Sequence, residues 1–202
     1  MKFLTEAGRL EAFSDGVIAV IITIMVLELK PPAGAGPHAL IDVLPGFGIY
    51  ALSFVYIGIY WNNHHHLLRA SRGIDGRVMW ANLNLLFWLS LVPFGTAWVG
   101  RYPFAPYPTL LYSLMMFLAA VAYALLERAL VDANKHNAAL ARALTTSKKG
   151  RLSILLYLLA VVASLFFPWV AICLLVIVAI MWFAPDRRLE PVITHTSSED
   201  TQ

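Results

Sequence analysis

Residues 9–27 read RLEAFSDGVIAVIITIMVL, and this stretch decides how the rest of the chain is interpreted. It passes from a charged segment that contains Arg9 and Asp15 directly into a long apolar run. A helix of that composition is suited to a membrane core, where an ionised side chain is costly and normally has a partner. The stretch therefore predicts a membrane helix whose aspartate is held by neighbouring polar groups.

The composition of the whole chain agrees with this interpretation. Apolar residues make up 59% of the 202 residues and charged residues 13%, whereas a soluble domain carries about 25% charged residues. The net charge of +3 comes from basic residues that are dispersed through the predicted loops. This dispersal argues against a nucleic-acid-binding surface. We expect the lipid bilayer to be the surroundings of this chain and expect no nucleic acid among its partners.

Apolar segments long enough to span a membrane recur along the chain. The six segments cover residues 12–30, 42–63, 79–99, 108–131, 151–167 and 169–184. Prolines end the first segment at Pro31 and separate the third from the fourth. We predict an all-α protein in which residues 1–185 form a single unit of six transmembrane helices. Residues 186–202 are expected to be a polar, disordered cytoplasmic tail.

The basic residues are distributed unevenly between the predicted loops. If the N-terminus is cytoplasmic, 13 of the 15 Lys and Arg residues fall on the cytoplasmic side, and only Lys30 and Arg101 fall outside. Loops rich in Lys and Arg stay in the cytoplasm. The pattern therefore predicts a multi-pass protein of the cell (inner) membrane with both termini in the cytoplasm.

Polar residues from several predicted helices meet at the cytoplasmic end. The first span begins near Ser14, the second ends in Trp61-Asn62-Asn63-His64-His65-His66, and the third begins near Asn82. Trp61 shares a helix face with His64 and His65, because residues three or four positions apart are neighbours on a helix. We predict a structural polar network, whose candidate members are Arg9, Phe13, Ser14, Asp15, Trp61, Asn62, His64 and His65.

The consecutive histidines also suggest a metal site or a proton relay. Consecutive residues on a helix point about 100° apart, so they cannot all chelate one ion. Di-iron membrane enzymes use several separated histidine boxes, and this chain has a single cluster. A histidine-based metal site and pH sensing remain alternatives to the structural network.

An apolar line follows the first span. The residues that lie within about 40° of one line on an ideal helix are Phe13, Gly16, Val20, Ile24 and Leu27. Thr23 lies at the edge of this line. Packing against other helices or lipid accounts for such a line on geometry alone, and a pore wall is the alternative.

The motif Arg9-x3-Phe13-Ser14-Asp15 resembles the first helix of the transmembrane protein 175 potassium-channel family. The ending of the second span also resembles that family, and the likeness covers most of residues 1–185. It implies the prokaryotic form, with one six-helix unit per chain and four chains around a central pore. The first helices would line that pore, with potassium as the permeant ion and no cofactor.

The resemblance also assigns roles to residues of the first helix. It implies a hydrophobic constriction at Val20, Ile24 and Leu27 and a selectivity hydroxyl at Thr23. The expected protein is a homotetrameric, potassium-preferring cation channel that conducts passively, and not an enzyme. A secondary transporter remains an alternative, because Pro93 and Gly95 could break the third span. A membrane enzyme built on the histidine cluster lacks a second ligand set.

Overall fold

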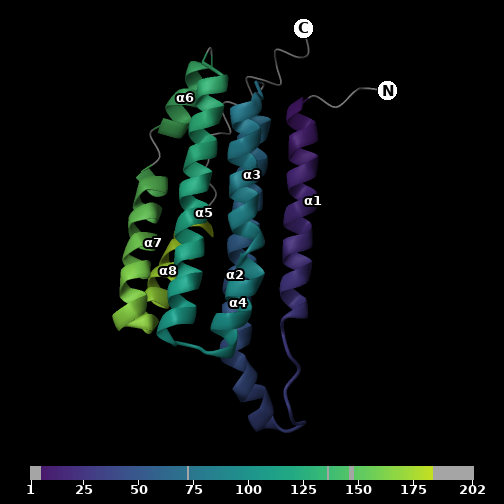
Figure 1. Cartoon of the computed structure of the whole chain (residues 1–202), viewed down its shortest axis with the longest axis vertical. Helices are drawn as coiled ribbons and strands as arrows, with labels where there is room; N and C mark the ends of the chain where they lie inside the picture. The colour runs from purple at the N-terminus through teal and green to yellow at the C-terminus, as the bar shows by residue number, and fades with distance from the viewer. Residues whose placement is uncertain (1–5, 72, 136, 146–147, 184–202) are drawn as a thin grey trace.

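A computed structural model describes residues 6–71, 73–135, 137–145 and 148–183 (Figure 1). The predicted tail, residues 186–202, lies outside the described residues. The described part of the chain is helical and contains no strand. Its helices are α1 (Glu6–Leu27), α2 (Pro37–Arg69), α3 (Gly76–Ser90), α4 (Val92–Arg101), α5 (Pro106–Ala133), α6 (Ala138–Thr145), α7 (Lys148–Phe166) and α8 (Pro168–Phe183).

Most of these helices have the length and composition of membrane spans. Among the described residues, α1, α2, the combined stretch of α3 and α4, α5 and α7 are long and apolar enough to cross a bilayer. The last apolar helix, α8, has 16 residues and is shorter. The predicted all-α membrane architecture is confirmed.

The third apolar segment is interrupted where α3 gives way to α4. Pro93 occupies the first turn of α4 and has no backbone N–H with which to continue the hydrogen-bond ladder of α3. In Figure 1, α4 continues α3 along the same side of the bundle. The interruption is therefore a local break within one continuous span of residues 76–101.

The helices stand side by side, with α1 at one edge and α7 at the other (Figure 1). The helix α1 contacts α2, α3 and α4, whereas α5 contacts α3 and α4 on one side and α7 and α8 on the other. We call the end that holds the first turns of α1 and the last turns of α2 the inner end. The opposite end, which holds the last residues of α4, is the outer end.

Buried hydroxyl groups join the helices in the middle of the bundle. Thr96 Oγ1 on α4 donates to Ser53 Oγ on α2 at 2.7 Å, and the Ser53 hydroxyl lies 2.8 Å from the Tyr112 hydroxyl on α5. A membrane offers no water to these groups, so each hydroxyl needs a protein partner. These bonds fix how α2, α4 and α5 are rotated against one another.

A pair of glycines lets α2 and α4 approach closely near the outer end. A Cβ atom placed on Gly46 would lie 3.2 Å from the backbone oxygen of Gly100. Small residues at a crossing point allow helix backbones to pack tightly in a membrane. The α2–α4 contact therefore leaves little room for a side chain at Gly46.

Candidate pore helix and polar network

The helix α1 has one face packed into its own subunit. Ser14, Ile18, Ile21 and Met25 are buried there against α2, α3 and α4. They recur at intervals of three and four residues, which keeps them on one side of a helix. The packing of this face fixes which other face of α1 points away from the subunit.

The predicted constriction residues lie on the face that points away. Val20 is 54% exposed, Ile24 44% and Leu27 73%, and Phe13 on the same line is also exposed. Large apolar side chains grouped on an exposed face need lipid, another subunit or a pore in contact with them. The structure thus separates the line of predicted pore residues from the core of the subunit.

Thr23 lies next to this line and is exposed. Its Oγ1 donates a hydrogen bond to the Val20 carbonyl oxygen at 2.8 Å. Because the hydroxyl proton is used within the helix, the lone pairs of Oγ1 are left to face outward. Such an oxygen accepts hydrogen bonds or contacts a cation.

A groove runs beside the line, between α1 and the α3–α4 span. It has a volume of about 750 Å³, and its lining includes Phe13, Val20 and Ile24 of α1 and Pro93 and Phe94 around the start of α4. The lining is mainly apolar, so water is a poor occupant. The groove and the exposed line form one continuous apolar surface.

The polar residues at the inner end of α1 contact two different helices. Asp15 accepts a hydrogen bond from Trp61 Nε1 of α2 at 3.0 Å. Ser14 Oγ accepts from Asn82 Nδ2 of α3 at 2.9 Å, and Asn82 Oδ1 lies 2.7 Å from His64 Nε2. Ser14, Asn82 and His64 are fully buried. Adjacent residues of α1 thus attach that helix to α2 and to α3.

A further contact lies one turn closer to the start of α1. Glu11 Oε1 is 2.6 Å from His65 Nδ1, and the His65 ring stacks on the Trp61 indole with ring centroids 6.1 Å apart. Trp61 and His65 are four residues apart on α2, as are Glu11 and Asp15 on α1. Two antiparallel helices are therefore joined by matched pairs one turn apart.

Other members of the predicted network lie apart from these bonds. Arg9 is exposed and makes no ion pair among the described residues, and Phe13 is exposed on the opposite face of α1. Asn62 is half-buried and makes no side-chain hydrogen bond within the described part of the chain. The network is thus centred on the residues that follow Arg9.

Sequence reasoning did not include Asn82 and Glu11 in the network. The sequence places Asn82 at the same depth of the membrane as the network, but depth does not reveal which way α3 is rotated. Glu11 precedes Asp15 by one turn, so the i, i+4 spacing used for Trp61 and His65 would have found it. Both residues bridge helices in the structure.

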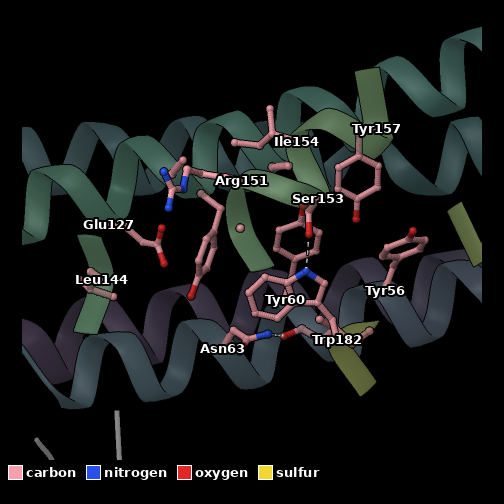
Figure 2. A pocket seen from close by; sticks show the side chains of 15 residues that line it. Tyr56, Tyr60, Asn63, Glu127, Leu144, Arg151, Ser153, Ile154, Tyr157 and Trp182 are labelled. Carbon is pink, nitrogen blue, oxygen red and sulfur yellow. Dashed lines mark hydrogen bonds between the residues drawn. The ribbon is translucent and has the colours of Figure 1, made fainter. Parts of the chain in front are cut away.

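A separate cavity lies between α2, α5, α7 and α8 (Figure 2). It has a volume of about 140 Å³, and Tyr56, Tyr60, Tyr157 and Trp182 lie around it. Trp182 Nε1 donates to Ser153 Oγ at 2.6 Å across this space. None of the residues of the predicted pore or network lines the cavity.

Comparison with known proteins places this architecture among channels. Residues 9–93 match the sequence model of the family described as endosomal/lysosomal potassium channel TMEM175. A potassium channel of Chryseobacterium sp. (strain P1-3) is 47% identical over 183 residues, which cover 91% of this chain and 95% of the relative. A potassium channel of Streptomyces collinus is 38% identical over 59% of this chain and 62% of its own length.

A solved structure has the same fold. The crystal structure of a lysosomal potassium-selective channel TMEM175 homologue from Chamaesiphon minutus matches with a TM-score of 0.79 and 29% identity, over 90% of this chain and 98% of the other. The resemblance predicted from the motif of the first helix is confirmed by these matches. The chain therefore belongs to the family of the endosomal/lysosomal potassium channel TMEM175, as a member close to its bacterial potassium channels.

Proposed function

We propose that the chain is one subunit of a potassium-preferring cation channel in which α1 of each copy lines a central pore. The family is one of ion channels and not an enzyme class. The observation that carries the proposal is the exposed line of Val20, Ile24 and Leu27, which faces away from the core of its own subunit. In a family of ion channels, an exposed apolar line of this kind is suited to form the wall of a pore.

The proposed pore requires several copies of the chain, because one helix cannot enclose a channel. A homotetramer places four copies of α1 around the axis. A neighbouring copy would then pack against the α3–α4 side of the apolar groove, at Pro93 and Phe94, and leave Val20 and Ile24 facing the axis. We expect the assembly to lie in the inner membrane with the inner end of the bundle, and both termini, in the cytoplasm.

The proposed constriction works by excluding water. Rings of Val20, Ile24 and Leu27 would form an apolar passage, and such passages close by dewetting when they are narrow. Val20 is the smallest of these three side chains, so at an equal distance from the axis its ring would be the widest of the three. The outward lone pairs of Thr23 would replace part of the hydration shell of a cation when the passage is open.

A flux assay on purified protein in liposomes tests the proposal. Potassium-gradient flux would be compared between the wild type, Leu27→Ala and the control Leu155→Ala, whose parent side chain is 51% exposed on α7. We expect flux that prefers potassium over sodium, that rises in Leu27→Ala and that is unchanged in the control. Chemical cross-linking of the same preparation should give a tetramer.

Two results of this assay would contradict the proposal. A stable oligomer that conducts no ions in either variant would refute the channel and favour a coupled transporter. If Leu27→Ala and Leu155→Ala change the flux equally, α1 does not line the pore. A chicken relative, 24% identical over 61% of this chain, is named an endosomal/lysosomal proton channel. Proton permeability should therefore be measured in the same liposomes with a proton-sensitive dye.

A further inference from the structure

The contacts at the inner end of α1 bring unlike ligand atoms together. Glu11 and Asp15 project from successive turns of α1 toward α2, and His65 of α2 faces them. One ligand atom from each of the three side chains lies within 4.8 Å of the other two. Two carboxylates and one imidazole, held by two helices, are a donor set that zinc-type cations prefer.

The charges at this position also favour a cation. Glu11 and Asp15 are like charges at an i, i+4 spacing, an arrangement that destabilises a helix unless a positive charge lies between them. Neither carboxylate makes an ion pair with a Lys or Arg of the described residues. His65 is the only cationic candidate that the described contacts bring to them, and a metal ion would supply the charge in its place.

The donor atoms are oriented by a second set of contacts. The Trp61 indole donates to Asp15 and stacks on the His65 ring, so one residue positions two of the three ligands. Partners of this kind fix ligand orientation in metal sites. The side chains of His65 and Glu11 are 30% and 22% exposed, which leaves a path for an ion to enter.

We propose that Glu11, Asp15 and His65 form a binding site for one divalent transition-metal cation of the zinc type per subunit. His65 would bind through Nδ1 as the neutral imidazole with its ring proton on Nε2, and Glu11 and Asp15 would each supply one oxygen. Ligand atoms on one tetrahedral zinc ion lie roughly 3.3 Å apart. The observed Nδ1–Oε1 distance of 2.6 Å and the 4.8 Å span of the cluster need only side-chain shifts to reach it.

A metal ion bound by Glu11 and Asp15 of α1 and His65 of α2 would cross-link the two helices at the inner end. A bound ion joins the two helices more strongly than the hydrogen bond it replaces, and it stabilises only the arrangement that holds all three ligands. The proposal does not depend on conduction, because metal binding is measured on the protein itself.

Calorimetric titration of Zn²⁺ into the purified, detergent-solubilised protein tests the site. We expect saturable binding at one ion per chain. Glu11→Gln and Asp15→Asn each keep a hydrogen-bond acceptor for their partner and remove a ligand charge. Each should weaken binding by at least 10-fold, as should His65→Gln, while each protein keeps the elution volume of the wild type.

A neighbouring histidine supplies the matched control. His66 packs edge-on against His65 but is not one of the three ligands, so His66→Gln should bind Zn²⁺ like the wild type. Absence of saturable binding in the wild type would overturn the proposal. Binding that survives both Glu11→Gln and His65→Gln, or that is lost equally in His66→Gln, would also overturn it.

Discussion

Asn82 is the residue whose removal should damage the inner end of the bundle most. Its side chain is fully buried, donates to Ser14 Oγ at 2.9 Å and lies 2.7 Å from His64 Nε2. The other ring nitrogen of His64, Nδ1, is buried and has no hydrogen-bond partner within residues 6–71, 73–135, 137–145 and 148–183. Asn82→Ala would therefore leave the His64 ring buried with no hydrogen bond at either nitrogen.

The cost of this substitution follows from the two lost bonds. A buried polar group left without a partner costs about 1–3 kcal/mol, which applies to His64. An interhelical hydrogen bond in a membrane protein contributes about 0.6 kcal/mol on average, which applies to Ser14, since its hydroxyl still donates to the Leu10 carbonyl oxygen. Adding the space left by the amide, we expect a loss of about 2–4 kcal/mol in the free energy of unfolding.

Denaturant titration of the purified protein, followed by tryptophan fluorescence, measures this loss. Asn84→Ala is the matched control, because Asn84 lies two residues along α3, is only half-buried and makes no side-chain hydrogen bond among the described residues. A double-mutant cycle with Ser14→Ala should give a coupling energy of at least about 0.5 kcal/mol.

Two results would refute this reasoning. If Asn82→Ala costs no more than Asn84→Ala, the buried amide does not stabilise the bundle. If Asn82→Ala and Ser14→Ala have purely additive effects, the two side chains do not interact in the folded protein, and the contact at 2.9 Å is not a stabilising bond.

Three further substitutions test other parts of the structure. Asp15→Ala removes the hydrogen-bond acceptor of the half-exposed Trp61 indole and should lower the stability of the proposed tetramer. Size-exclusion chromatography should then show more dissociated protein than for the wild type, while the potassium-to-sodium flux ratio stays near that of the wild type. An intact tetramer without potassium preference would contradict this prediction. Ile24→Ala should increase the leak flux of ions in liposomes. Unchanged leak flux from correctly assembled protein would exclude a constriction at Ile24. Gly95→Val should lower the thermal midpoint by several degrees, because even a Cβ would lie 2.9 Å from Met115 Sδ and 3.2 Å from the ring of Tyr112, and both side chains are buried in α5. Gly58→Val, where a Cβ meets nothing within 4 Å, should leave the thermal midpoint near that of the wild type.

The sequence was sufficient to predict the membrane class and the family. Lipid demands long apolar helices, so the composition and the runs alone exclude a soluble fold. The family followed from the motif around Arg9 and Asp15, which stands at the start of the first run. Both conclusions depend on local sequence, which needs no knowledge of how the helices pack.

The rotation of the helices could not be read from the sequence. Asn82 joins the network because α3 turns its amide toward α1, and that rotation depends on packing across the whole bundle. The start of α2 differed for another reason. It begins at Pro37, before the apolar segment at 42–63, because a helix continues into the polar headgroup region where hydropathy gives no signal.

The position of the bonds along α1 has a mechanical consequence. Among the described residues, the side-chain hydrogen bonds and ion pair described above from α1 to another helix involve Glu11, Ser14 or Asp15, and beyond Asp15 the buried residues of α1 are apolar. Hydrogen bonds therefore anchor α1 at its inner end, and apolar packing at Ile18, Ile21 and Met25 is what resists a tilt about that end. Leu27 lies roughly 18 Å beyond Asp15 on a helix, so a tilt of about 5° would displace it by about 1.6 Å. That displacement is comparable to the radius of a water molecule, so a slight tilt of α1 would be enough to wet or dry the proposed apolar ring.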